Sequence, residues 1–422
     1  MKVTLIVLAI LLTMFSGTAQ VYETLPPEYI QTVQFKAAGQ EFSGTPIARL
    51  GETLTLNFDD IIADEANYFY VIEHYNFDWT PSDLSKNEYL DGFDNLRIME
   101  YQNSFSTLQS YTHYELKIPN RSTKRLKVSG NYLLKILNED GSLVFSRKFI
   151  VYESLVNVAA QIKRSRDLKY IDTKQVVQFS VGNDMGKREN EFIFRNPDRT
   201  VKTLVIQNND LHSAITDLKP QYTIGNKLIY RYDQEAAFWG GNEYLGFDSK
   251  DLRATTLNTK QIEAEDIYHH FLYTDGVRAD RPYTYNPDIN GHFVVTAVEG
   301  QNDAVEADYV WMYFSLYCSE DIGGGTFYLY GNFNNFALDN STKLTYNKQK
   351  GGYETKRLFK QGFYNYKYIL LNKDGSVNDG IISGNFDETE NQYTVLVYYR
   401  ELGARYDRIV GAGSANSRNI TN

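Results

Sequence analysis

Histidine is the residue type in this chain that most often binds a metal ion, and it occurs six times: His74, His113, His212, His269, His270 and His292. Metal-binding histidines usually stand one helical turn apart or beside cysteines. The adjacent His269 and His270 would point to opposite faces of a strand, so they could not easily share an ion. His74 and His113 each lie in a predicted strand and could face each other across a sheet. We expect hydrogen-bonded structural histidines, and we predict neither a metal site nor a cofactor.

The stretch that begins at Asp288 has oxygen ligands of the kind that calcium prefers. Asp288 and Asn290 stand two residues apart, and Glu299 follows where a calcium-binding loop would end. Such a loop needs its glycine at the sixth place, whereas Gly291 stands at the fourth. Residues 293–298 are apolar and strand-like. We therefore expect a turn that leads into a strand rather than a calcium site.

Neighbouring carboxylates raise the question of acid–base catalysis, as in glycoside hydrolysis. Asp59 and Asp60 are adjacent, and Glu263, Glu265 and Asp266 form a second group. An acidic protein is expected to carry such groups on solvated faces, and nothing in the sequence places two of them in one cleft. The chain has no nucleophile elbow, phosphate-binding loop or dinucleotide fingerprint. We predict a protein without catalytic residues.

Charge and cysteine content narrow the classes of protein further. The 422-residue chain has 53 acidic and 43 basic residues, which argues against nucleic-acid binding because phosphate contacts need clustered Lys and Arg. Residues 1–19 combine an early lysine, a short apolar run and small residues before the expected cleavage site, as signal peptides do. Cys318 is the only cysteine, so no internal disulfide can form. We expect an exported protein.

Short strands, rather than helices, are predicted to position these residues. The 34 tyrosines, 24 phenylalanines and 29 glycines suit aromatic strands joined by tight turns. Residues 130–137 and 142–151, with a turn between them, predict a hairpin. We predict an all-β fold of three consecutive immunoglobulin-like β-sandwiches. Their expected boundaries are 20–155, 156–305 and 306–402, and a C-terminal segment follows, 403–422, with a mobile last part.

The expected central unit has two local departures from the strand pattern. Residues 210–218 could form one short helix, ended by Pro220. Gly240 and Gly241 stand between bulky residues. Such a glycine pair marks a backbone that needs unusual dihedral angles or a close approach to another segment.

Aromatic side chains gather at the ends of two predicted strands. Tyr75, Phe77 and Trp79 end one strand, and Phe238 and Trp239 end another. One interpretation is that these loop residues fold back onto the core. The other is that they are exposed anchors for a protein partner, because Trp and Tyr dominate interface hot spots. We take the five as candidate residues of a partner interface.

Residues 74–79 (HYNFDW) and 88–93 (EYLDGF) resemble the signature of the plug protein of the type IX secretion system. Other matching blocks run from about residue 29 to residue 410. The resemblance implies a non-enzymatic periplasmic protein at the inner face of the outer membrane. It also implies a partner, the outer-membrane translocon barrel SprA. The protein would close the periplasmic opening of that barrel when no cargo is exported, and would be monomeric in the complex.

A second resemblance covers only part of the predicted third unit. Residues 332–336 (NFNNF) and 362–368 (GFYNYKY) are similar to the glycogen-binding module found beside amylase-type enzymes and kinases. That module usually has tryptophan where this chain has Phe336, which weakens sugar stacking. The resemblance to this module implies an alternative function, that of a periplasmic carbohydrate-binding protein. A carbohydrate-active enzyme would also need a catalytic domain, for which the three β-units leave no segment.

Overall fold

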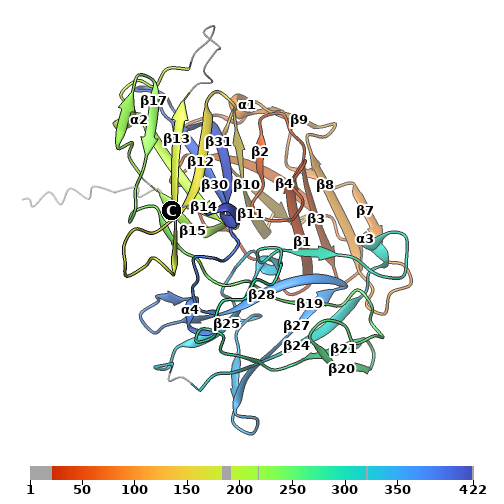
Figure 1. Cartoon of the computed structure of the whole chain (residues 1–422). Helices are drawn as coiled ribbons and strands as arrows, with labels where there is room; N and C mark the ends of the chain where they lie inside the picture. The colour runs from red at the N-terminus through yellow and green to blue at the C-terminus, as the bar shows by residue number, and fades with distance from the viewer. Residues whose placement is uncertain (1–20, 183–191, 217, 320–321, 421–422) are drawn as a thin grey trace, which may run out of the picture.

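The structure, a computed structural model, describes residues 21–182, 192–216, 218–319 and 322–420, so the predicted signal peptide lies outside it. The regular secondary structure of the described residues is nearly all strand and forms three β-sandwiches (Figure 1), which confirms the all-β prediction. None of the described helices is long and apolar enough to cross a membrane. All are short: α1 (Lys86–Tyr89), α2 (Pro197–Thr200), α3 (Asp303–Glu306), α4 (Gly380–Ser383) and the 3-10 turns η1 (Asn332–Asn334) and η2 (Ser417–Asn419).

The first sandwich packs two sheets around an aromatic and aliphatic core. One sheet has the strand order β1 (Ile30–Ala37), β3 (Leu54–Asp60), β8 (Thr112–Ile118), β7 (Glu100–Asn103). The other has the order β2 (Ile47–Arg49), β11 (Leu143–Tyr152), β10 (Gly130–Leu137), β4 (Phe69–Tyr75), β6 (Leu96–Arg97). In addition, β5 (Leu90–Gly92) pairs with β9 (Thr123–Leu126). β10 and β11 form the predicted hairpin. Leu54, Leu56 and Phe58 of β3 are buried, because successive side chains of a strand alternate between its faces.

The middle sandwich combines strands from distant parts of the chain. The first of its two sheets has the strand order β12 (Asn157–Arg164), β13 (Lys174–Gly182), β17 (Lys227–Tyr230), β16 (Tyr222–Ile224), and β18 (Ala237–Trp239) also pairs with β13. The second has the order β15 (Asp210–Thr216), β14 (Val201–Gln207), β30 (Gln392–Tyr399), β31 (Arg408–Asn416). The second of these sheets, which we call the central sheet, is covered on both faces. One face packs on β12 and β13, and the other packs on the first sandwich.

Three expectations about this region are wrong. Residues 393–399, expected in the third unit, form β30, which pairs with β14 of the middle sandwich. Residues 210–216, expected to be helical, form the strand β15. The C-terminal residues 408–416, expected to be partly mobile, form β31 and pair with β30. In β30, Val395 and Val397 face one core while Leu396 and Tyr398 face another, so the strand lacks the alternation that would indicate its neighbours.

The third sandwich has its own core, in which Phe247, Phe314 and Tyr366 are buried. The expected boundary at 305 is wrong, because residues 245–295, expected in the second unit, supply strands of this sandwich. In one sheet, β28 (Gly362–Leu371) pairs with β19 (Leu245–Asp248), β23 (Phe293–Val295), β25 (Thr326–Tyr330) and β29 (Val377–Asn378). The other sheet has the strand order β20 (Thr259–Ala264), β21 (Tyr268–Leu272), β24 (Tyr309–Tyr317), β27 (Gly352–Lys360), β26 (Thr345–Asn347), and β22 (Asp275–Gly276) also pairs with β24. The turn predicted at Asp288 leads into β23, as expected.

Buried polar contacts join the three sandwiches. The carboxylate of Asp59 in β3 lies 2.7 Å from the ammonium group of Lys360 in β27, and both side chains are 1% exposed. Tyr309 of β24 donates a second hydrogen bond to Asp59, at 2.6 Å. Tyr398 of β30 donates to Asn131 of β10 at 2.7 Å. The expectation that Asp59 and Asp60 lie on a solvated face is therefore wrong, because both are buried.

Candidate functional site

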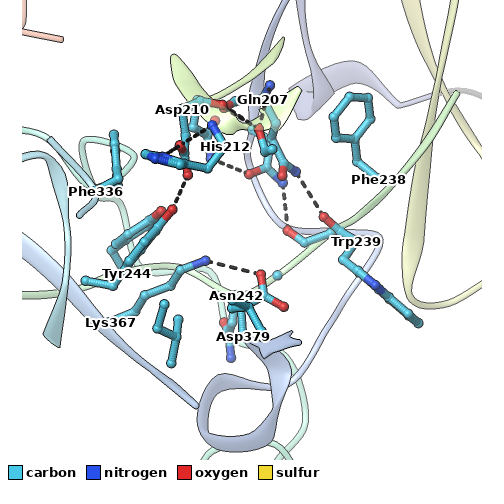
Figure 2. Close-up of a pocket in the computed structure, with 18 of the residues that line it drawn as sticks. Gln207, Asp210, His212, Phe238, Trp239, Asn242, Tyr244, Phe336, Lys367 and Asp379 are labelled. Atoms are coloured by element: carbon cyan, nitrogen blue, oxygen red, sulfur yellow. Dashed lines mark hydrogen bonds and ion pairs between the residues drawn. The ribbon is translucent and has the colours of Figure 1, made fainter. Parts of the chain in front are cut away.

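A cleft of about 590 Å³ lies where the middle sandwich meets the third sandwich (Figure 2). β15 and β18 line it from the middle sandwich, and β25, β28 and the loop after η1 line it from the third. We call it the Lys367 cleft, after the lysine at its base. Its volume is in the range of small-molecule and peptide sites.

Asp210, the first residue of β15, is the main polar group at the inner end of this cleft. Its carboxylate accepts a hydrogen bond from the hydroxyl of Tyr330 in β25, so it connects the two sandwiches. The same carboxylate lies 3.0 Å from Nδ1 of His212. That hydrogen bond raises the pKa of His212, although burial opposes the shift. The His212 side chain is 63% exposed, so it reaches the open side of the cleft.

Lys367 of β28 supplies the positive charge. Its ammonium group lies 3.3 Å from the carboxylate of Asp379, and it lies over the rings of Tyr244 and Tyr330 at 5.3 and 5.4 Å. Burial would lower the pKa of Lys367, but Tyr244 and Asp379 outweigh it, so the net shift is upward and the amine stays charged. Since the lysine and both carboxylates already have partners, the cleft offers packing and hydrogen bonding rather than a free nucleophile.

A second cleft, of about 570 Å³, lies on the other face of β15, between the central sheet and the first sandwich. We call it the Trp79 cleft. Lys148 Nζ lies 4.3 Å from the centre of the Trp79 ring at its wall. The two clefts meet at the start of β15, where both are lined by the same four residues: Asp210, His212, Phe336 and Leu338.

The five aromatic candidates from the sequence lie around these two clefts. Phe77 and Trp79 line the Trp79 cleft, and Phe238 and Trp239 line the Lys367 cleft. Tyr75 is buried behind Trp79, with 6.3 Å between the two ring centres.

The candidates differ in exposure. Trp79 and Phe238 are buried, and Phe77 is half-buried against Tyr398. Trp239 is 44% exposed and its ring contacts Lys174, whose Nζ lies 4.4 Å from the ring centre.

Sequence reasoning did not single out Asp210, Lys367 or Asp379. Asp210 is the first residue of the helix expected over residues 210–218, and that expectation hides its position at a sheet edge. Lys367 and Asp379 gave no local signal because their partners come from other strands. Phe336, which stands where the glycogen-binding module usually has tryptophan, is 3% exposed and packs on Tyr330, with 5.2 Å between ring centres.

The histidines are hydrogen-bonded, as predicted. His74 bonds to Ser82, His113 to Asp59, His212 to Asp210, His269 to Tyr313, and His270 and His292 to main-chain carbonyl groups. Across the described ranges, no group of three or more His, Cys, Asp or Glu side chains is arranged to hold a metal ion.

Comparisons with known proteins agree with this architecture. The family described as "Type 9 secretion system plug protein 1st domain" matches residues 30–153, which span the first sandwich. The crystal structure of a hypothetical protein from Parabacteroides merdae is 33% identical, with a TM-score of 0.88, and the match covers 94% of this chain and 100% of that one. No curated protein matches the chain. Through its first sandwich, residues 30–153, the chain belongs to the family of type 9 secretion system plug protein first domains.

Proposed function

We propose that this protein is a non-enzymatic periplasmic plug that binds the translocon barrel SprA at the inner face of the outer membrane. It closes the periplasmic opening of the barrel when no cargo is exported, and one copy occupies each complex. The family match over residues 30–153 is the observation that carries this proposal. A barrel wide enough for folded cargo would leak if it stayed open, so a reversible stopper is needed.

The connections between the sandwiches support a blocking role, because a stopper must keep its shape under contact. Asp59 and Lys360 hold the first sandwich to the third, and Asn131 and Tyr398 hold the first to the middle one. Asp210 and Tyr330 join the middle sandwich to the third. Each sandwich is therefore fixed to both of the others by buried side chains, and the surface offered to a partner is preformed.

Trp239 is the aromatic candidate that best suits direct contact with the barrel. It keeps 44% of its surface exposed, whereas Trp79 and Phe238 are buried. Lys174 and Tyr170 hold its ring from the protein side. A large amphipathic ring of this kind gives contact area at little cost in conformational entropy.

The carbohydrate-binding alternative gains no support at the position that suggested it. Phe336 is 3% exposed and its ring packs on Tyr330. A sugar ring could therefore not stack on it without a rearrangement of both clefts.

Copurification from envelope extracts tests the proposed function. The tagged chain, expressed in a host with type IX secretion, should recover a large outer-membrane β-barrel protein after mild detergent extraction. Trp239→Ala should reduce the yield, and Tyr222→Ala, a change of a more exposed aromatic residue on β16, should not. If no barrel is recovered while the chain itself is folded and abundant, the proposed function is wrong.

A further inference from the structure

The central sheet has one open edge. β15 pairs with β14 on one side, and no other strand of the described residues pairs with it. Most side chains of β15 are partly buried, and those of His212 and Thr216 are exposed to solvent. An edge of this kind presents main-chain N–H and C=O groups that natural sheets usually cover. On β15 the N–H of His212 donates to the Asp210 carboxylate and the C=O of Asp210 accepts from the Ser213 hydroxyl, but no described strand covers the edge.

The opposite edge of the same sheet is covered at the start of β31 (Arg408–Asn416). The main-chain N–H groups of Glu153 and Leu155 donate to the carbonyl groups of Ile409 and Val410 in β31, both at 2.8 Å. The segment between the first and middle sandwiches therefore covers the start of β31 at that edge. β15 lacks such a cover, although its sheet is buried on both faces.

The two clefts lie on the two faces of this open edge. Successive side chains of β15 alternate between them: Ser213 and Ile215 line the Lys367 cleft, and Ala214 and Thr216 line the Trp79 cleft. A strand added beside β15 would send its own side chains alternately into the same two clefts, because strand side chains have a period of two. The clefts have the position expected for the side chains of a missing neighbour strand.

We propose that β15 binds an extended segment of a partner protein by strand addition, with alternate side chains seated in the Lys367 and Trp79 clefts. Main-chain hydrogen bonds to β15 would supply affinity, and the clefts would supply specificity. Since the central sheet lies between two other layers, the added strand needs apolar side chains on both faces. Leu211, Ile215 and Phe77 are the apolar surfaces that these side chains would meet.

Charge indicates a further property of the occupant. The charged groups that line the two clefts are four carboxylates, from Glu23, Asp78, Asp210 and Asp379, and two ammonium groups, from Lys148 and Lys367. The excess of negative charge favours a segment that carries lysine or arginine beside its apolar residues. The inferred partner is therefore a protein with an apolar, basic and extended segment. This inference goes beyond the proposed function and holds whether or not that partner is the translocon.

Selection from a phage-displayed library of random twelve-residue peptides tests the inference on the full mature chain. The selected peptides should carry apolar residues at consecutive positions, for both faces of the strand, and at least one basic residue. In hydrogen–deuterium exchange, a selected synthetic peptide should slow the amides of residues 210–216 by about tenfold or more, because newly hydrogen-bonded amides exchange only on local opening. The amides of β31, at the opposite edge, should be unaffected.

Two variants that fill one cleft each give an independent readout. Ser213→Phe places a ring in the Lys367 cleft and Ala214→Phe places one in the Trp79 cleft, so each should weaken peptide binding by about tenfold. Thr223→Phe on β16, an exposed edge strand of the neighbouring sheet, should bind as the wild type does. If either variant fails to fold, the exchange pattern of the wild-type protein still decides the question.

Several results would overturn the inference. One is the absence of any enriched peptide; another is protection centred on β16 or β31 instead of β15. A protein dimer that the selected peptide dissociates would show that a second copy of this chain covers the edge. None of these results bears on copurification with the barrel, so the inference and the proposed function can fail separately.

Discussion

At the residue scale, one buried ion pair connects regions that are 301 residues apart in sequence. Burial would raise the pKa of Asp59, but Lys360 and His113 outweigh it and lower the pKa below its usual value. A lowered pKa means that this carboxylate stabilises the fold above its unfolded-state pKa. That contribution is lost as the pH falls through the lowered pKa of the folded state.

Removing one partner of this pair should be more harmful than removing both. Lys360→Met leaves the Asp59 charge buried without its cation, and should cost about 3–5 kcal/mol of unfolding free energy. The double variant Asp59→Asn with Lys360→Met should recover much of that loss, since neither charge is then buried alone. Urea denaturation of the wild type, both single variants and the double variant measures the coupling. Additive losses would contradict the account.

The pKa of a second carboxylate, that of Asp288, indicates that its contribution to stability depends on pH in the opposite direction. Burial, together with the nearby carboxylates of Glu243 and Glu390, raises the pKa of Asp288 from its ordinary value of 3.8 to about 7. Between those two values the folded state binds a proton that the unfolded state has released, so stability should fall as the pH rises.

Denaturation midpoints at pH 5 and pH 8 should show this fall in the wild-type protein. Asp288→Asn should show a smaller difference between the two conditions, because its side chain does not titrate. Asp140→Asn, in the exposed turn of the β10–β11 hairpin, is the matched control and should keep the wild-type difference. An undiminished difference in Asp288→Asn would show that other groups cause it.

At the element scale, the sequence predicts local structure much better than long-range pairing. The β10–β11 hairpin is predicted because its strands are adjacent and its turn ends in Gly141, whose φ is +82°. The pairing of β14 with β30 is missed, because about 190 residues separate the strands and both faces of β30 are apolar. The clefts cannot be predicted for the same reason: they form only where β15 lies beside the first and third sandwiches.

The glycine pair at the end of β18 is an element-scale feature that the sequence did predict. A Cβ atom on Gly240 would lie 1.9 Å from the carbonyl oxygen of Phe386, and Gly241 has a φ of +69°. This is where the chain leaves the middle sandwich and passes close to the segment that returns to it.

Gly240→Ala should therefore lower the free energy of unfolding by about 2 kcal/mol or more, because the added Cβ displaces the backbone at this close approach. Gly241→Ala has space for its Cβ but a left-handed φ, so its cost should be about 1 kcal/mol. Thermal denaturation of both variants measures this order, with Gly39→Ala, also left-handed and unobstructed, as the control for Gly241. The reverse order would contradict the close approach.

At the scale of the whole molecule, the three sandwiches form one connected body in which each contacts the other two. The resemblance of residues 74–79 and 88–93 predicted the family, and the match over residues 30–153 confirms it. The way the sandwiches join could not be predicted, because the joining residues, such as Asp59, Asn131 and Asp210, each pair with residues far away in sequence. A body of fixed shape is what the proposed plug requires.

Channel conductance tests the central claim most directly. The purified translocon barrel, reconstituted in a planar lipid bilayer, is measured before and after the mature chain is added to its periplasmic side. The account predicts that conductance falls to near the bilayer background and recovers when the protein is washed out. Unchanged conductance while the chain is demonstrably bound to the barrel would contradict the plug function.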